Sequence, residues 1–388
     1  MPESRATLIA ALHATENRVG ASRPAVTDSS GTLTYGALVD AVVRLAYRLE
    51  QTTPVGETIG LIDLPGSQLL QLLLGAALAG RTVALLPIKA SRRALATACA
   101  TAKVGRILCP RESLRRVTSA LRSPAALEVA WPIHAVEDLL RPSNVIERIQ
   151  ARWRSRHLER ATESITQGVA ITFSLDRAAR VQGALFTQRN LLAGVRQVQT
   201  RQRWSADDIV LCTLPPHQPA TLVAGLLAPV LSGVHAVLVK HARGVRLVTR
   251  LVRELEATRL IATPVYLRHY ARVAGQRDLS SLRSILSIGE PLATPMASDL
   301  AERFGIPVQR SFSSAGVAGF VALVAVIVGW RRAAASVGLA VVMALVATID
   351  RGDARTLFFH PSTPTWKPVV HFAGAALLVA VFALAARR

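Results

Sequence analysis

The side chains suited to nucleophilic or metal chemistry are few and scattered along the 388-residue chain. Cys99, Cys109 and Cys212 form no C-x-x-C pair and have no Cys/His spacing suited to zinc. The motifs H-E-x-x-H and G-x-S-x-G, a GK[ST] phosphate loop and an EF-hand are also absent. We therefore predict no metal site and no disulfide framework, and we expect three small, buried cysteine side chains.

His134 and Asp138 have the spacing H-x-x-x-D, which occurs in some acyltransferases. The second histidine and the glycine that usually accompany this pattern are missing. We interpret the two residues as part of a surface turn.

Composition and net charge limit the kinds of partner that the protein can bind. The apolar fraction of 51% allows a large core, and the formal net charge of +21 comes almost entirely from arginine. A basic protein can attract nucleic acid or anionic lipid. Because no arginine block alternates with aromatic residues and no nucleic-acid motif is present, we exclude nucleic acid and expect attraction to an anionic inner leaflet.

Short apolar runs alternate with helical runs between residues 55 and 310, which predicts an α/β fold of layered, mainly parallel sheets. The expected strands are 57–63, 82–87, 209–215, 234–240, 259–263, 282–287 and 306–309, and the expected helices are 67–80, 221–233, one from Pro264 and one from Thr294. Residues 110–165 are arginine-rich with few strand signals, and we interpret them as a linker-like insertion within a domain 1–316.

After Gly316 the composition becomes apolar, with uncharged runs at 317–330, 333–349 and 369–386, the last containing His371. About 17 apolar residues are the lower limit for a membrane-spanning helix, so the second and third runs are predicted spans and the first is marginal. His371 is either a functional group within a span or a side chain that reaches the interface.

Paired arginines set the expected orientation. Arg331-Arg332 and Arg387-Arg388 should lie on the cytoplasmic side of the membrane. Two spans, 333–349 and 369–386, place both pairs on that side. The run 317–330 is then interfacial, re-entrant or packed on the soluble domain; three spans and a buried helical bundle stay open as alternatives. The N-terminus has no signal-peptide pattern, so we expect a multi-pass protein of the cell inner membrane with residues 1–316 in the cytoplasm.

Four segments in order carry a family resemblance. They are PAVTDSSGTLTYGALVDAVVRLAYRL (24–49), GAALAGRTVALLP (75–87), LPPHQPATLVAGLLAPVLSGVHAVLV (214–239) and DLSSLRSILSIGEPLATPMASDLAERFGIPV (278–308). With them, residues 25–316 resemble the N-terminal region of the adenylate-forming (AMP-binding) superfamily, which includes acyl- and aryl-CoA synthetases. The resemblance implies ATP or AMP and magnesium as cofactors, and an acyl or aryl acid as substrate.

The family's phosphate loop, T-S-G-T-T-G-x-P-K-G, corresponds to SLDRAARVQG (174–183) here. Ser174 and Gly183 fit the pattern. Asp176 and Ala179 stand where glycines belong, and Gln182 stands where lysine belongs. A carboxylate facing phosphate repels it, and a missing glycine prevents close approach of the backbone, so we expect impaired phosphate binding.

The family's Y-G-x-T-E motif corresponds to FSSAG (312–316), where Phe312 could stack on adenine but Ala315 and Gly316 cannot contact phosphate or hold magnesium. The resemblance implies an adenine platform and an acid-binding pocket. The platform would consist of Gly289, Glu290, Pro291 and Phe312, and the pocket wall of His217 and Pro264. His217 is equally well explained as a hydrogen-bonded histidine at the end of a strand.

The remaining family elements, including the C-terminal lysine, have no match, so we assign no catalytic residue. The first hypothesis is a membrane-anchored, catalytically impaired ligase-like protein that binds an acyl or aryl acid, a carrier protein or a partner enzyme in lipid or secondary-metabolite assembly. The second is an active acid-adenylating ligase completed by a partner. The third is a decayed or frameshifted ligase gene product.

Overall fold

A computed structural model describes most of the chain up to residue 325. The described residues are 7–87, 91–121, 131–142, 144–151, 153, 168–175, 181–215, 218–239, 244–289, 292, 294–312 and 322–325.

The larger sheet has eight strands in the order β14-β13-β12-β11-β9-β10-β1-β2. Its strands are β1 (Pro24–Asp28), β2 (Gly31–Thr34), β9 (Ile209–Cys212), β10 (His235–Leu238), β11 (Arg259–Ala262), β12 (Ser284–Ile288), β13 (Val308–Phe312) and β14 (Ala322–Ala325). All neighbours pair in parallel except the outermost pairs, β1–β2 and β13–β14, which are antiparallel. The central strands read as continuous apolar runs because both of their faces are covered.

The smaller sheet has the order β6-β5-β3-β4-β7-β8. Its strands are β3 (Thr58–Leu61), β4 (Thr82–Leu85), β5 (Val104–Cys109), β6 (Ile133–Ala135), β7 (Gly168–Leu175) and β8 (Val181–Thr187). Only the β7–β8 hairpin is antiparallel. The predicted layered α/β fold with mainly parallel sheets is therefore confirmed, with antiparallel strands added at the sheet edges.

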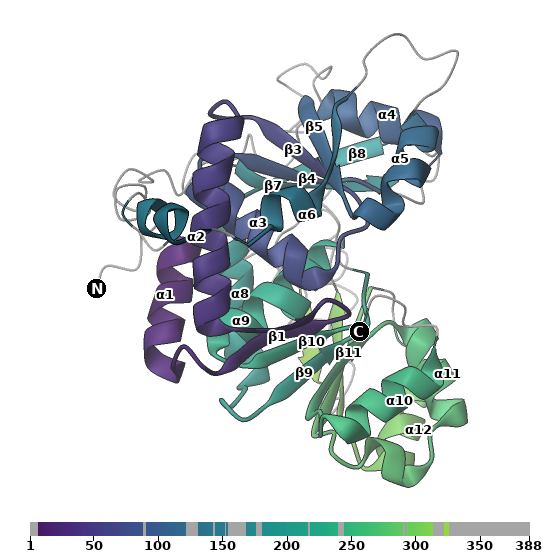
Figure 1. Ribbon diagram of the computed structural model, residues 1–388. Coiled ribbons are helices and arrows are strands. Elements are labelled where there is room, and N and C mark those ends of the chain that lie inside the picture. Colours follow the sequence, from purple (N-terminus) through teal and green to yellow (C-terminus); the bar gives the residue numbers. More distant parts are fainter. Residues whose placement is uncertain are drawn as a thin grey trace, which may run out of the picture.

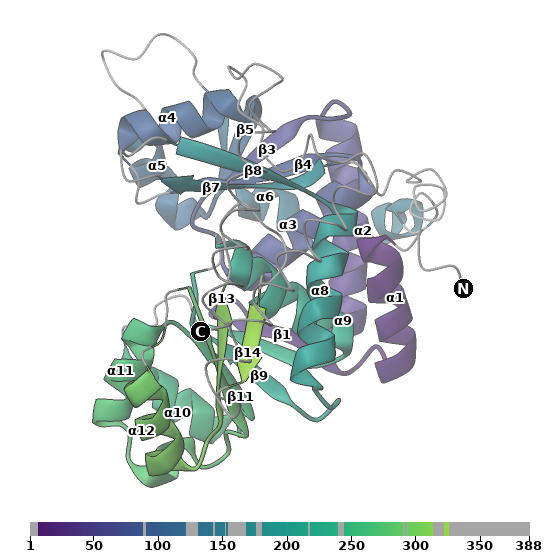
Figure 2. The ribbon, with the colours of Figure 1, turned by 180° about the vertical axis from the view of Figure 1, so that it is seen from behind.

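Helices lie between the two sheets and on their outer faces (Figures 1 and 2). The inner helices are α1 (Leu8–Val19), α2 (Tyr35–Thr52), α3 (Gly66–Leu78), α8 (Gln188–Gln202), the π-helix η3 (Thr221–Leu227) and α9 (Ala228–Ser232). The outer helices are α4 (Arg92–Thr101) and α5 (Leu114–Leu121) on the smaller sheet, and α10 (Val245–Glu254), α11 (Pro264–Val273) and α12 (Thr294–Phe304) on the larger sheet. The short elements are η2 (Arg111–Ser113), α6 (Val136–Leu140) and η4 (Gln276–Leu279).

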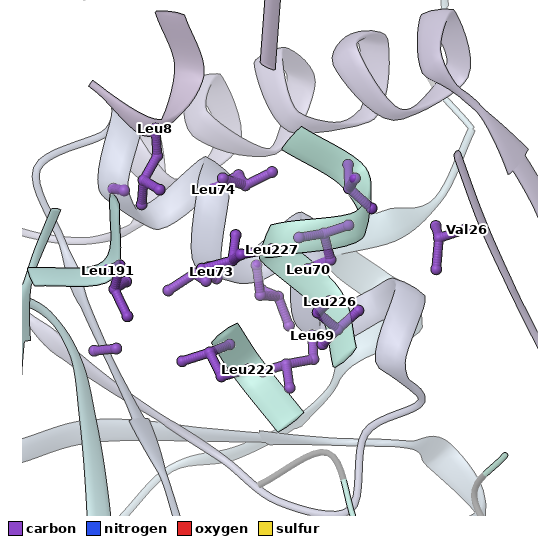
Figure 3. Close-up of a cluster of buried hydrophobic side chains, with 14 of the residues drawn as sticks. Leu8, Val26, Leu69, Leu70, Leu73, Leu74, Leu191, Leu222, Leu226 and Leu227 are labelled. Carbon is purple, nitrogen blue, oxygen red and sulfur yellow. The ribbon is translucent and has the colours of Figure 1, made fainter. Parts of the chain in front are cut away.

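One apolar cluster joins both sheets through the inner helices. Figure 3 shows leucines of α3 and η3, among them Leu70, Leu73 and Leu227, converging in its centre. The cluster reaches Ile59 of the smaller sheet and Val210 of the larger sheet. Since α3 is apolar almost all round, it is buried on every side between the two sheets.

The helix expected over 221–233 has a wider first half than an α-helix. Residues 221–227 form a π-helix, and Ala228 N–H bonds five residues back to the Val223 carbonyl. Pro229 has no N–H to give to the Gly225 carbonyl, which accounts for the local change of hydrogen-bond register. Gly225 also lies against Cys212 of β9, where an added Cβ would be 2.5 Å from the sulfur.

The described part of residues 110–165 contains regular structure. It forms η2, α5, β6 and α6, and β6 extends the smaller sheet beside β5. Sequence patterns gave no sign of β6 because three residues are too few to show a period of two.

Within the apolar run 317–330, Ala322–Ala325 form β14 at one edge of the larger sheet. The predicted spans 333–349 and 369–386 lie outside the described residues, as does His371. In the described part of the chain, no helix has both the length and the apolar character needed to cross a bilayer.

Candidate functional site

Four parallel strands of the larger sheet end at a common edge. Their order along that edge is β13, β12, β11 and β9, so the residues that follow them must lie side by side. These strands carry or lead into Phe312, Gly289, Pro264 and Thr213. The register supports this grouping, because Ile288 pairs with Ser311, Ala262 with Ser287 and Ile261 with Cys212. Ligands of open α/β sheets bind beyond the carboxyl ends of such strands, which makes this edge the candidate site.

Pro264 begins α11 directly after β11. Thr263 is the N-cap, and its hydroxyl accepts a bond from Tyr266 N–H at 3.5 Å. Proline suits the first helical position because its missing N–H would have no helical partner there. Pro264 is buried at the start of α11, and its place in the wall of an acid-binding pocket stays a prediction.

Gly289 follows β12 with φ +107 and is exposed. An L side chain is strained at this φ, and a Cβ built there would lie 3.8 Å from Cγ2 of Thr263. The structure therefore brings Gly289 and the start of α11 together. Two residues earlier, the hydroxyl of Ser287 is buried and has no hydrogen-bond partner in the described structure.

Thr213 and Tyr270 connect β9 to α11 behind the same edge. The Thr213 hydroxyl donates to the Ile261 carbonyl at 3.1 Å, and its side chain also bonds with Tyr270. Burial raises the pKa of Tyr270 to about 12, despite the opposing effect of the Thr213 bond. Tyr270 stays neutral at pH 7, and its ring stacks on Tyr266 with centroids 6.3 Å apart. Sequence reasoning missed Thr213, Thr263 and Tyr270, although Thr-Pro before a helical run is a recognisable N-cap signal.

In the segment aligned with the phosphate loop, residues 174, 175 and 181–183 lie in strands, whereas 176–180, with Asp176 and Ala179, lie outside the described residues. Phe173 pairs with Gly183, Ser174 with Gln182 and Leu175 with Val181 in the β7–β8 hairpin. Gln182 is exposed, and Gly183 lies against the Phe173 ring, where an added Cβ would meet a ring carbon at 3.3 Å. An extended backbone points successive N–H groups to opposite sides, so residues 174, 175 and 181–183 by themselves form no concave anion cradle.

Three other predicted site residues, His217, Glu290 and Pro291, lie outside the described residues. Phe312 is described as the last residue of β13, where its backbone pairs with Ala322.

Nothing in the described edge of the sheet suits magnesium. Thr213, Thr263, Ser287 and Gly289 offer hydroxyls and backbone groups but no carboxylate, the ligand that hard cations prefer. Across the described residues, no cluster of three or more His, Cys, Asp or Glu side chains is present. Gly289, which has no Cβ, leaves the backbone of this edge open to the close approach of a flat ring.

The cysteines and the H-x-x-x-D pair have structural explanations. All three cysteines are free and buried, as expected. His134 lies on β6 and Asp138 on α6, both exposed, and Asp138 pairs with Arg111 at 2.5 Å. The two residues belong to regular surface elements of the smaller sheet, and the predicted turn is wrong.

The family model of the AMP-binding enzyme matches residues 13–357. Because this match covers more than half of the chain, the chain belongs to the AMP-binding enzyme family. The match runs through 317–330 and 333–349, which the hydropathy pattern assigned to a membrane anchor.

Solved ligases share the fold. MatB from Rhodopseudomonas palustris, solved with bound ATP, is 15% identical over 84% of this chain and 63% of its own, with a TM-score of 0.70. o-Succinylbenzoate CoA synthetase from Bacillus subtilis, solved with a product analogue, is 17% identical. The match covers 83% of this chain and 62% of the synthetase, with a TM-score of 0.68. Fatty acid AMP ligase from Legionella pneumophila is 15% identical. The match covers 82% of this chain and 57% of the ligase, with a TM-score of 0.68. The chain thus spans less than two thirds of the length of each of these ligases.

Proposed function

We propose that this AMP-binding family member binds an acyl or aryl acid, alone or with AMP, at the carboxyl edge of the larger sheet, and that it adenylates such acids poorly or not at all. Binding is supported by the meeting of Gly289, Thr263 and Pro264 at that edge. Poor phosphate handling is supported by the sequence, in which Asp176 and Ala179 stand where the family's phosphate loop has glycines and Gln182 stands where it has lysine. Phosphoryl-type chemistry depends on positioning and charge stabilisation, so loss of several phosphate ligands together removes most of the rate.

Pyrophosphate exchange over a panel of fatty and aromatic acids tests the catalytic half of this proposal. The expected result is exchange at background for the full chain and for the Ser174→Ala and Gln182→Ala variants. Exchange above background that either substitution abolishes would show an active ligase, the second hypothesis, and would end the impaired-enzyme proposal.

Calorimetric titration with AMP and with the same acids tests the binding half. Gly289→Ala is expected to weaken binding at least about tenfold, since it strains the backbone and adds a Cβ at the edge. Gly305→Ala is the matched control, because Gly305 also has positive φ (+68) but nothing lies within 4 Å of its added Cβ. Equal affinity of both variants would place the ligand elsewhere.

We further propose that the chain acts at the inner membrane through 317–388, with 1–316 on the cytoplasmic side. The support is the apolar character of 333–349 and 369–386 and the paired arginines that follow 330 and 386. Membrane fractionation of cells expressing the full chain tests it, and recovery of the full chain in the soluble fraction would refute it.

A further inference from the structure

A short helix beside α2 carries an unusual exposed apolar face. Residues 145–151 and 153 are helical, and Figures 1 and 2 show this helix at the periphery of the molecule, on the side of α1 and α2. Val145, Ile146, Ile149 and Trp153 are 69%, 66%, 63% and 63% exposed. Their spacing of i, i+1, i+4 and i+8 places them on one side of the helix. They are four of the eight large apolar side chains that are exposed in the described structure.

The opposite side of this helix is firmly attached to the fold. Ala151 is buried, and Asn144 caps the helix by accepting from Glu147 N–H at 2.8 Å. Glu147 receives a bidentate pair from Arg48 of α2, with distances of 2.5 and 3.0 Å. The bond from Arg48 is the main cause that lowers the pKa of Glu147. Because such a paired carboxylate stays charged at neutral pH, it holds the helix in one orientation with its apolar face outward.

Four arginines lie beside this helix, of which Arg141 and Arg148 are exposed and Arg48 is buried against the side opposite the apolar face. Arg48 also donates to the carbonyls of Leu139 and Arg141, at 2.5 and 2.8 Å, and Arg148 lies 3.6 Å from Asp40. Burial lowers the pKa of Arg44, the Arg48 and Arg148 charges lower it further, and Asp40 opposes the shift. The cluster contains four arginines and two carboxylates, and they are Arg44, Arg48, Arg141, Arg148, Asp40 and Glu147. Its net charge is therefore positive.

We propose that Val145, Ile146, Ile149 and Trp153, the apolar helix face, insert into the surface of an anionic lipid bilayer. An interfacial helix combines such a face with basic residues, and tryptophan favours the boundary between headgroups and acyl chains. Arg141 and Arg148, the exposed cations beside this helix, are the ones that lipid phosphates would pair with. A second copy of the chain is disfavoured as occupant, because a two-fold contact would bring two cationic clusters together. The proposal depends neither on ligand binding at the sheet edge nor on residues 317–388.

A fluorophore at Ile149→Cys in the full chain tests this proposal. Selective labelling is practical because the native cysteines are buried, and burial raises the pKa of Cys99 to about 12 and of Cys109 to about 11. A nitrobenzoxadiazole label at position 149 is expected to show blue-shifted, brighter emission with phosphatidylglycerol-containing vesicles but not with pure phosphatidylcholine vesicles. High salt should weaken the response.

Val55→Cys is the matched labelling control, because Val55 is an apolar side chain that is 82% exposed and lies outside the helix. Its label should not respond, even if another segment holds the protein on the vesicle. The double variant Ile146→Ser, Ile149→Ser should lower the partitioning of the full chain onto vesicles by about tenfold, whereas Val55→Ser should not. Partitioning is measured by vesicle flotation or from the emission of a label attached at position 153.

Three results would overturn the proposal. One is an unchanged emission at position 149 on vesicles that bind the protein, and another is an equal response at position 55. The third is a response that rises with protein concentration without lipid, which would indicate a second copy as the occupant. Unchanged thermal unfolding of the serine variant would show that loss of binding is not loss of folding.

Discussion

Asp208 shows how a single buried charge fixes the start of the larger sheet. Its side chain is fully buried just before β9 and accepts from the Thr258 hydroxyl at 2.6 Å, Ser205 N–H at 2.9 Å and Arg259 at 3.2 Å. Burial alone would raise the pKa of Asp208, but these bonds outweigh it and lower the pKa below its ordinary value. The carboxylate thus holds β9 and β11 in register at the end opposite the candidate site.

Asp208→Asn should destabilise the fold by about 3 kcal/mol, because it leaves Arg259 facing an uncharged, partly donating group. The folded-state pKa is lowered, so the stabilisation is complete above the ordinary Asp pKa of about 3.9 and is lost as pH falls from there through the lowered folded-state pKa. Urea unfolding at pH 7 and pH 3 measures this difference, which should be smaller at pH 3.

Asp207→Asn is the control for this prediction. Asp207 is the neighbouring residue, but its side chain is 89% exposed and it pairs with Arg23 at 3.3 Å. Surface pairs contribute about 0–1 kcal/mol, so this variant should unfold almost like the unmodified chain. Equal effects of the two substitutions would contradict a special role for Asp208.

At the scale of elements, helix starts are specified locally. α8 begins with a capping box, in which the Thr187 hydroxyl accepts from Asn190 N–H at 3.1 Å and the Asn190 side chain accepts from Thr187 N–H at 3.0 Å. α2 begins more simply, with Thr34 accepting from Ala37 N–H at 3.3 Å. Both caps satisfy N–H groups that have no partner within the helix.

Thr187→Ala should cost about 1–2 kcal/mol, because Thr187 is buried and its hydroxyl, besides capping the helix, donates to the Asn190 side chain at 2.8 Å. Thr34→Ala should cost about 0.5–1 kcal/mol at its longer, more exposed cap. Thermal unfolding of the two variants measures the difference. A larger loss at Thr34 would show that the additional bond of the Thr187 hydroxyl to Asn190 adds no stability.

At the scale of the whole molecule, the N-terminal helices bind the inner layer together. Leu8 N–H donates to the Gln188 side chain at 2.9 Å, the Thr15 hydroxyl to the Leu231 carbonyl at 3.0 Å and the Tyr35 hydroxyl to the Val230 carbonyl at 2.7 Å. Each bond joins segments far apart in the chain, and all lie beside the apolar cluster that contacts both sheets. The two sheets should therefore unfold together.

Leu73→Ala in α3 should lower stability by about 3 kcal/mol and reduce the protection of both sheets equally. Hydrogen exchange at increasing urea concentrations, followed in peptides of β3 and β9, measures this coupling. Leu260→Ala is the control on the outer face of the larger sheet, in the cluster with α10 to α12. If Leu73→Ala exposed only one sheet, the sheets would be separate folding units.

The sequence by itself determined the class of fold and most of its elements. Runs such as 209–212 and 260–262 are apolar at every position, which is typical of strands covered on both faces, and Thr-Pro at 263–264 marks a helix start. Local signals of this kind depend on neighbouring residues alone. The phosphate-loop substitutions Asp176, Ala179 and Gln182 were also visible at this level, once the resemblance had supplied the pattern.

Only the tertiary structure decided which strands are neighbours and which residues meet. Hydropathy reports that a strand is buried but not what covers it, so it did not place β1 beside β10 or β9 beside β11, pairings that join segments far apart in the chain. The same packing brings Thr213, Thr263 and Gly289 to one edge and leaves Ile146 and Ile149 exposed on a helix whose other side is held by Arg48. Side chains separated along the chain come together there because burying the inner helices between two sheets leaves few other arrangements.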